Sequence, residues 1–410
     1  MFSVIPNSIV QELLKENGNE SILNYYNEMN GKAKKDEIGW FYQIGNGELD
    51  NSQISDFFEI PKSIRNILGH LKNEINGQLS YDDYSQLRDD SDEETKLFLS
   101  AQLFAKMMDK DTYMVSSSDL NRNLLISINS QLHYSFMLSM DLIDDDNMTE
   151  NDFFRYLEAC THNFKFTKVI IDENPYFEEF YVTYIGETIC SQLDPLRTRN
   201  ISIEMLFKSK IFEELLSIDP NEGINFSSDN LFSIQKAAEV LETFRRADVD
   251  NDGVLTTNDL MNVDGRKWTP SFSQALIDNA HRAGVPNFFW FVRIDSAWKN
   301  FGKSWANTIL FDTLDIDHDG YISELEIRWF IKDHINEPSN KEIIKGREAV
   351  IFESLFNEIM DGYQEKTRKL SKDDFIHGGD RSFCIGYLVD YRVFNKNVLQ
   401  QWTKPESAKN

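Results

Sequence analysis

One pattern recurs along the 410-residue chain and constrains its fold more than any other feature. In each copy an apolar, helix-like segment leads into a polar loop. The loop is followed by one β-compatible apolar residue, a Ser/Thr or Asp, an acidic residue and another apolar residue. The clearest copies are Asp248–Leu260 (DVDNDGVLTTNDL) and Asp315–Ile327 (DIDHDGYISELEI). Repeats of this size predict units that bury their apolar faces against neighbouring units.

Weaker copies accompany these two, and they lack side-chain oxygens at several loop positions. We therefore expect them to be helix pairs that hold no ion. Most gaps between the central apolar residues span 25 to 53 residues, but the gap from Leu255 to Ile322 is 67, which leaves room for one more unit around Val285. The central apolar residues of all copies are Leu79, Val115, Met148, Ile201, Phe226, Leu255, Ile322 and Leu370.

The loop from Asp315 to Glu326 has the residue types that a calcium site needs. Calcium takes about six to eight oxygen ligands, and a twelve-residue loop can supply them from alternating positions. Gly320 stands at position 6, where the backbone turns sharply and a side chain would strain it. Glu326 closes the loop at position 12 with two oxygens. The expected ligands are Asp315, Asp317, Asp319, Tyr321 through its backbone carbonyl, and Glu326.

The loop from Asp248 to Asp259 follows the same plan with one change. Position 12 is Asp259, which is one methylene shorter than Glu. We expect the shorter side chain to weaken calcium binding and to favour the smaller, octahedral Mg²⁺. The helix after the loop should be short, because Asp264–Gly265 and Pro270 interrupt it. The expected ligands are Asp248, Asp250, Asp252, Val254 through its backbone carbonyl, and Asp259.

These two loops resemble the calcium loop of the EF-hand superfamily, over about 100 residues from Leu231 to His334. The resemblance implies an all-α fold: an array of EF-hand-like helix–loop–helix units, mostly degenerate, with short β-contacts between loops. In calmodulin-like members two hands pair through such a contact. Asp248 and Asp315 are 67 residues apart, farther than paired loops usually are. Two arrangements follow: the intact hands pair directly, or each pairs with a degenerate neighbour.

The repeats suggest four segments along the chain. We expect degenerate EF-hand-like repeats in residues 1–160 and further degenerate hands in a helical segment, 161–230. The two intact loops, 248–259 and 315–326, belong to residues 231–340. A C-terminal helical segment, 341–410, carries one more degenerate hand.

Charge and motifs exclude several classes of function. The formal net charge of −26 repels phosphate backbones, so we expect no nucleic-acid partner. The N-terminus shows no signal peptide and no apolar run is long enough to span a bilayer, so we expect no membrane insertion and a cytoplasmic location. No P-loop, G-x-S-x-G or kinase signature is present, so we expect no enzymatic activity of the chain itself.

Three functional hypotheses remain. The first is an intracellular calcium sensor or calcium-modulated interaction protein that binds Ca²⁺ at two loops, with Mg²⁺ as a second candidate at 248–259. The second is a structural scaffold of cytoskeletal or axonemal type, built from mostly inactive hands. The third, an enzyme with an EF-hand regulatory part, has no motif in its favour. In the first two the partner is another protein, which the sequence does not identify.

Overall fold

The computed structural model describes residues 60–73, 77–167, 177–220, 229–250, 252–263, 265–363, 368–378 and 385–400. The predicted copy centred on Phe226 and the first 59 residues of the predicted segment 1–160 lie outside these ranges. The chain divides into two compact units. Unit 1 comprises Met1–Val182 and Arg199–Ser233, and unit 2 comprises Thr183–Thr198 and Ile234–Asn410. The four-segment division stays a prediction.

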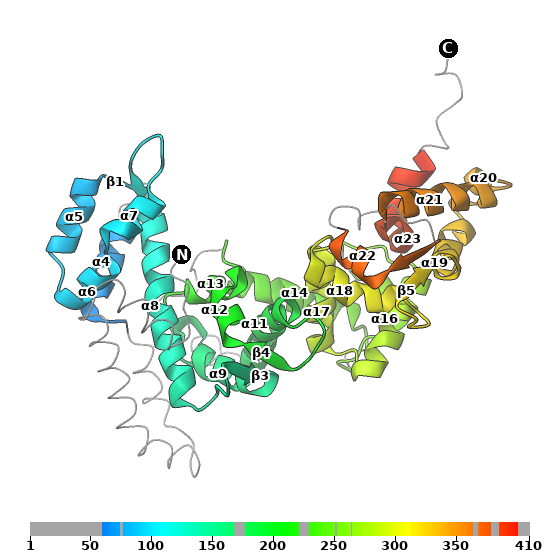
Figure 1. Ribbon diagram of the computed structural model, residues 1–410. Coiled ribbons are helices and arrows are strands. Elements are labelled where there is room, and N and C mark those ends of the chain that lie inside the picture. Colours follow the sequence, from blue (N-terminus) through cyan, green and yellow to red (C-terminus); the bar gives the residue numbers. More distant parts are fainter. Residues whose placement is uncertain are drawn as a thin grey trace, which may run out of the picture. The chain divides into compact units, whose positions relative to one another are not determined.

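Both units are built of helices with strands of only two or three residues, which confirms the predicted all-α class (Figure 1). In unit 1 the long helix α8, cyan in Figure 1, follows one short strand and precedes another. Its elements are α4 (Lys62–Asn73), β1 (Gln78–Leu79), α5 (Tyr81–Asp89), α6 (Glu93–Phe98), α7 (Ala101–Met107), β2 (Val115–Ser116), α8 (Ser117–Ser139), β3 (Asn147–Thr149), α9 (Glu150–His162), the start of α11 (Phe177–Leu193), β4 (Asn200–Ser202), α12 (Ile203–Lys208) and α13 (Lys210–Leu216).

Unit 2 contains both clear copies of the repeat. Each loop lies between two helices, as the flanking apolar spacing predicts. The elements are the rest of α11, then α14 (Ile234–Ala247), α15 (Thr257–Met261), α16 (Pro270–Ala283), α17 (Phe288–Lys299), α18 (Ser304–Leu314), β5 (Tyr321–Ser323), α19 (Glu324–Asn336), α20 (Lys341–Ile344), α21 (Glu348–Tyr363), β6 (Lys369–Ser371), α22 (Lys372–His377), α23 (Gly386–Val389), α24 (Tyr391–Phe394) and the π-helix η2 (Asn395–Leu399).

The strands pair two by two, and the predicted central apolar residues lie opposite each other. The three antiparallel ladders place Leu79 against Val115, Met148 against Ile201, and Ile322 against Leu370. All six side chains are buried. The predicted short β-contacts between loops are therefore confirmed. The hand at Asp315 pairs with a degenerate neighbour rather than with the hand at Asp248.

The hand at Asp248 meets a different kind of partner. The backbone N–H of Leu255 donates to the carbonyl of Pro286 at 2.9 Å. Pro286 lies in the link between α16, which ends at Ala283, and α17, which begins at Phe288. The additional unit expected around Val285 is thus present as two helices joined by a four-residue link, 284–287, rather than by a twelve-residue loop.

A capping residue explains why Ser or Thr follows the central apolar residue. At each of seven loops this residue is the N-cap of the next helix, and its side chain accepts a hydrogen bond from a backbone N–H three residues later. Such a cap satisfies a donor that has no partner within the helix. The seven residues are Ser80, Ser116, Thr149, Ser202, Thr256, Ser323 and Ser371.

The degenerate loops keep the sharp backbone turn even though they lack its glycine. Gly253 and Gly320, two residues before the central apolar residue, have φ values of 80° and 86°. The same place in four degenerate loops holds a non-glycine residue in the left-handed region, which costs energy for a side chain with a Cβ. These residues are Tyr113 (58°), Asp146 (61°), Arg199 (61°) and Arg368 (57°).

The C-terminal segment Gly386–Leu399 packs onto the hands of unit 2. It runs antiparallel to the stretch before α16, where the N–H of Thr269 donates to the carbonyl of Val389 at 2.9 Å. On its other side, the ring of Phe394 stacks on that of His334 in α19, with centroids 4.2 Å apart. Both rings are fully buried. None of the described helices combines the length and apolar character needed to cross a bilayer.

Candidate metal centres in two loops

The Asp315–Glu326 loop brings together carboxylates from both of its ends. Asp315 follows α18 and Glu326 lies in the first turn of α19. One oxygen each from Asp315, Asp317 and Glu326 lie within 4.8 Å of one another. The Asp315 and Glu326 side chains are buried, and Asp317 is exposed. This is a spacing at which three oxygens can contact one ion.

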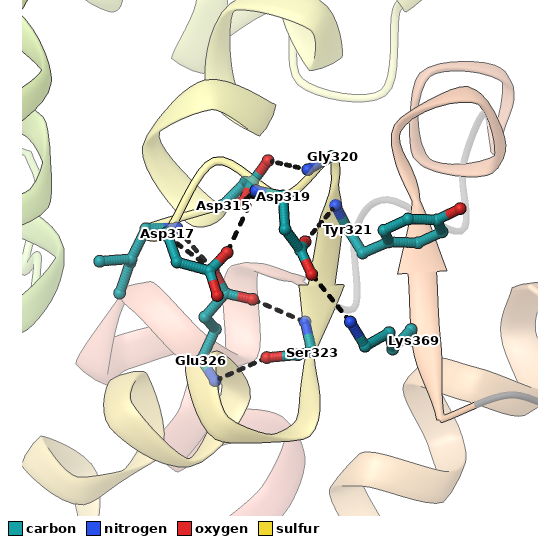
Figure 2. A network of polar contacts seen from close by, with 9 residues as sticks. Asp315, Asp317, Asp319, Gly320, Tyr321, Ser323, Glu326 and Lys369 are labelled. Atoms are coloured by element: carbon teal, nitrogen blue, oxygen red, sulfur yellow. Dashed lines mark hydrogen bonds and ion pairs between the residues drawn. The ribbon is translucent and has the colours of Figure 1, made fainter.

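Backbone N–H groups of the loop hold these carboxylates in place (Figure 2). The N–H of Gly320 donates to Asp315 Oδ2 at 2.9 Å. The two oxygens of Glu326 accept from Ile316 N at 2.6 Å and from Ser323 N at 2.7 Å. Ser323 and Glu326 together form a capping box at the start of α19. The loop is therefore wound around its own carboxylates, and the residue at position 12 also starts the exiting helix.

Burial and crowding of like charges leave these carboxylates short of positive charge. Burial raises the pKa of the Asp315 carboxyl, and the neighbouring Asp317 and Asp319 add to the rise. Burial likewise raises the pKa of Glu326. Both shifts show that the charged forms are disfavoured in the metal-free loop. A bound divalent cation would reverse this, because an opposite charge favours the ionised carboxylate.

Asp319, the expected ligand at position 5, lies apart from this group of three. Its Oδ1 accepts the N–H of Tyr321 at 2.9 Å, and its Oδ2 forms an ion pair with Lys369 Nζ at 2.8 Å (Figure 2). The hydrogen bond with Lys369 lowers the pKa of Asp319. Lys369 belongs to β6, the strand of the degenerate partner loop.

The Asp248 loop gathers a different set of three. Oxygens of Asp248, Asp250 and Asp252 lie within 4.8 Å of one another. Gly253 N donates to Asp248 Oδ2 at 2.9 Å, and Val254 N donates to Asp252 Oδ1 at 2.8 Å. The other oxygen of the buried Asp248, Oδ1, has no hydrogen-bond partner among the described residues. A buried, unpaired carboxylate oxygen of this kind is costly unless a cation contacts it.

Asp259 is not a member of the three-carboxylate group at this loop. Its Oδ2 accepts from the N–H and the hydroxyl of Thr256, at 2.7 and 2.6 Å, so that the two residues form a capping box. The exiting helix α15, Thr257–Met261, has only five residues, as the sequence predicts. Asp259 therefore caps the helix in the described structure, and its role as a ligand stays a prediction.

The donor set at both loops consists of carboxylate oxygens, which are hard ligands suited to Ca²⁺ or Mg²⁺ rather than to softer metals. Among the described residues, the closely gathered groups of three or more acidic, histidine or cysteine side chains are those at these two loops. The degenerate loops bring no such group together within the same ranges. The fold and the loops thus define a protein with two candidate calcium-binding hands among degenerate ones.

Sequence reasoning missed two basic residues next to the Asp315 loop. Arg368 and Lys369 lie directly before Leu370, in a copy judged only by its lack of ligands. Arg368 pairs with Glu324 of α19, with Nε 2.9 Å from Oε2. The signal was the predicted pairing of Ile322 with a degenerate neighbour: once Leu370 faces Ile322, the residues before it lie beside the metal loop.

Comparison with known proteins agrees with this class. The EF hand family model matches residues 241–264 and 308–330, which contain both loops. The chain is therefore an EF-hand protein, as the resemblance of its loops implied. The calcineurin B protein of Yarrowia lipolytica is 32% identical over 108 residues, covering 26% of this chain and 59% of that protein.

Longer similarity extends to a particular kind of protein. The B'' gamma regulatory subunit of serine/threonine-protein phosphatase 2A from Danio rerio is 23% identical over 335 residues, covering 78% of this chain and 70% of that protein. The human protein of the same name is 23% identical over 328 residues, covering 77% and 69%. A chain of a solved structure described as the PP2A PR70 holoenzyme matches with a TM-score of 0.52 and 16% identity, covering 65% of this chain and 98% of that one.

Proposed function

We propose that this chain is a regulatory, non-catalytic subunit of a serine/threonine phosphatase of the 2A class and that it binds calcium through its two intact hands. The observation that carries the proposal is the extent of the similarity to the B'' gamma subunits, 78% of this chain, with both hands inside unit 2. The similarity is much longer than the two hands alone. It therefore concerns the array of degenerate hands as well.

In this proposal Asp315, Asp317 and Glu326 form the centre of one site, and Asp248, Asp250 and Asp252 form the centre of the other. Tyr321 and Val254 add backbone carbonyls at position 7. Asp319 and Asp259 complete the sites once they leave their present partners, Lys369 and Thr256. The ion would neutralise clustered carboxylates and draw the two helices of the hand to a fixed angle. Mg²⁺ is the alternative ion at 248–259, because Asp259 is short.

The partner in this proposal is the phosphatase itself. The degenerate hands supply packed surface rather than ion sites, which suits a subunit whose work is binding. The net charge of −26 favours a basic surface on the partner or on the substrates it receives. A cytoplasmic location and an association with the cytoskeleton stay predictions.

Two measurements test the proposal. Calorimetric titration of the full chain with calcium, with and without millimolar magnesium, should show two sites. Asp248→Asn and Asp315→Asn should each remove one of them. Separately, the purified chain should bind phosphatase 2A core enzyme that lacks a regulatory subunit. Absence of calcium binding would overturn the calcium part of the proposal, and failure to bind the core enzyme would overturn the partner.

The dependence of core-enzyme binding on calcium separates the sensor from the scaffold. The scaffold is favoured by one observation: four degenerate loops in the described residues keep the left-handed turn at position 6 without gathering ligands. These loops preserve shape without ion binding. A scaffold should hold the core enzyme equally well in calcium and in chelator, whereas a sensor should change its affinity for the enzyme or the activity of the complex.

A further inference from the structure

Lys369 reaches across from a loop without ligands to a ligand of the Asp315 loop. In the β5–β6 ladder the Cα of Lys369 lies opposite that of Ser323, one register position from the Ile322–Leu370 pair. The Lys369 ammonium is 2.8 Å from Asp319 Oδ2 and 5.3 Å from the centroid of the Tyr321 ring. Figure 2 shows the lysine side chain pointing from its strand toward Asp319.

The contact uses the acidic group that the metal would need. Asp319 Oδ1 accepts the N–H of Tyr321 and Oδ2 is paired with Lys369, so both oxygens are engaged. The lysine also lies in the field of the other carboxylates. Asp319 raises its pKa most, and Asp317 and Glu326 contribute to the same rise. The ammonium is therefore attracted by the same cluster that would attract a divalent cation.

We infer that Lys369 is an internal counter-ion of the Asp315–Glu326 loop that opposes calcium and sets the affinity of this site. The inference rests on the proposed function, because it requires that the loop bind calcium. Lys369 neutralises part of the loop charge when no metal is present. When a divalent cation enters, the ammonium is repelled, and Asp319 must exchange the lysine for the metal.

The size of the effect follows from elementary electrostatics. A unit charge about 6 Å from a divalent ion weakens binding by roughly tenfold if the medium between them behaves as water. The lysine and Asp319 side chains are 47% and 36% exposed, so salt screens their interaction. The expected effect at physiological salt is a factor of roughly three to ten.

The Asp248 loop provides an internal contrast. Its partner segment is the link 284–287 (Gly-Val-Pro-Asn), which has no basic side chain. One oxygen of Asp248 is buried without a partner, whereas the ligand at position 5 of the other loop is neutralised by a lysine. The two sites should therefore differ in how strongly an added positive charge has already been supplied by the chain.

The test replaces Lys369 in the full chain, with the other site silenced by Asp248→Asn. Lys369→Gln removes the charge and Lys369→Arg keeps it. Lys372→Gln is the matched control: Lys372 Nζ is 2.7 Å from Asp312 Oδ1 and 5.4 Å from the centroid of the Phe311 ring, but Asp312 lies outside the twelve-residue loop. It therefore repeats the ion pair, the ring contact and the charge change without touching a ligand.

Calcium affinity is measured by calorimetry at low and high potassium chloride. Lys369→Gln should lower the Kd roughly three- to tenfold at low salt, and the gain should shrink at high salt. Lys369→Arg and Lys372→Gln should stay within about twofold of the parent. Denaturant unfolding in chelator verifies that every variant folds, which is expected because both lysines are at the surface.

Three results would overturn the inference. An unchanged or weaker affinity in Lys369→Gln would mean that the lysine positions Asp319 for the metal rather than opposing it. An equal gain in Lys372→Gln would reduce the effect to general charge. If the parent chain binds no calcium at the Asp315 loop, the proposed function and this inference fail together, whereas the first two results leave the proposed function standing.

Discussion

Ile322 and Leu370 lie directly opposite each other in the β5–β6 ladder, and both side chains are fully buried. Ile322 belongs to a loop with clustered carboxylates. Leu370 belongs to a degenerate loop whose tight turn is made by Arg368 at a φ of 57° rather than by glycine. The shape of the metal loop is thus supported by a loop that gathers no ligands. This relationship gives the degenerate hands a function: they position their partners.

Leu370→Ala should therefore weaken a calcium site from which no ligand has been removed. Truncating a buried leucine costs about 2–5 kcal/mol, and here the lost contact is the one that holds β5. We expect lower calcium affinity at the Asp315 loop together with lower stability of unit 2. Tryptophan fluorescence reports on this unit, because Trp268, Trp290, Trp298, Trp305 and Trp329 lie in it. Leu79→Ala, the equivalent change in unit 1, is the control, and an equal loss of calcium affinity there would contradict the argument.

Glu326→Gln should lower calcium affinity at the Asp315 loop by roughly tenfold or more while the chain stays folded. Calcium affinity depends on the number of charged ligands, and Gln keeps the size of the side chain but not its charge. Gln also keeps one oxygen that can accept from Ile316 or Ser323, so the start of α19 should survive. Glu324→Gln is the matched control, because Glu324 pairs with Arg328 and Arg368 and not with the loop. An unchanged calorimetric titration would remove Glu326 from the ligand set.

Asp259→Glu should raise the calcium affinity of the Asp248 loop and reduce competition by magnesium. The longer side chain can reach the ion with both oxygens, as Glu does at this position in calcium-selective loops. The capping box should persist, because Ser or Thr followed three residues later by Glu is its common form. Calcium titrations with and without magnesium measure both effects. If magnesium competes as strongly as before, the length of Asp259 does not set the ion preference.

Much of this fold could be predicted from one local pattern. The central apolar residues were recognisable because each is followed by a Ser or Thr that caps a helix. At Ser80, Thr256 and Ser323 the acidic residue three positions later completes a capping box. This also explains why acidic residues persist at position 12 of loops that gather no ligands. Capping alone is sufficient reason to keep Asp83, which accepts from the N–H and hydroxyl of Ser80.

Other features depend on contacts that no local pattern encodes. The partner of Leu255 is a four-residue link around Pro286, which has no loop motif to recognise. The ion pair of Lys369 with Asp319 joins residues 50 positions apart. The packing of Gly386–Leu399 against His334 is likewise a long-range arrangement. In each case the residue types are ordinary, and only the three-dimensional pairing of hands gives them their role.

His334 should make unit 2 sensitive to acid. Its Nε2–H donates to the carbonyl of Leu388 at 2.9 Å, and its ring is fully buried against Phe394. Burial lowers the pKa of His334 to about 4, although the Leu388 carbonyl and the charges of Asp333 and Asp390 oppose the shift. The folded chain therefore keeps the ring neutral where the unfolded chain, with an ordinary histidine pKa of about 6.5, binds a proton.

The sign of the effect follows from this difference in proton uptake. Above about pH 6.5 His334 is neutral in both states and costs nothing. As the pH falls from about 6.5 toward 4, the unfolded state gains the proton, and the free energy of unfolding should decrease by roughly 3 kcal/mol from this residue. Urea unfolding in chelator, followed by tryptophan fluorescence at several pH values, measures the slope. His334→Gln should be less stable at pH 7 but should lose less stability between pH 6.5 and 4. An equally steep decline in that variant would assign the acid sensitivity to other groups.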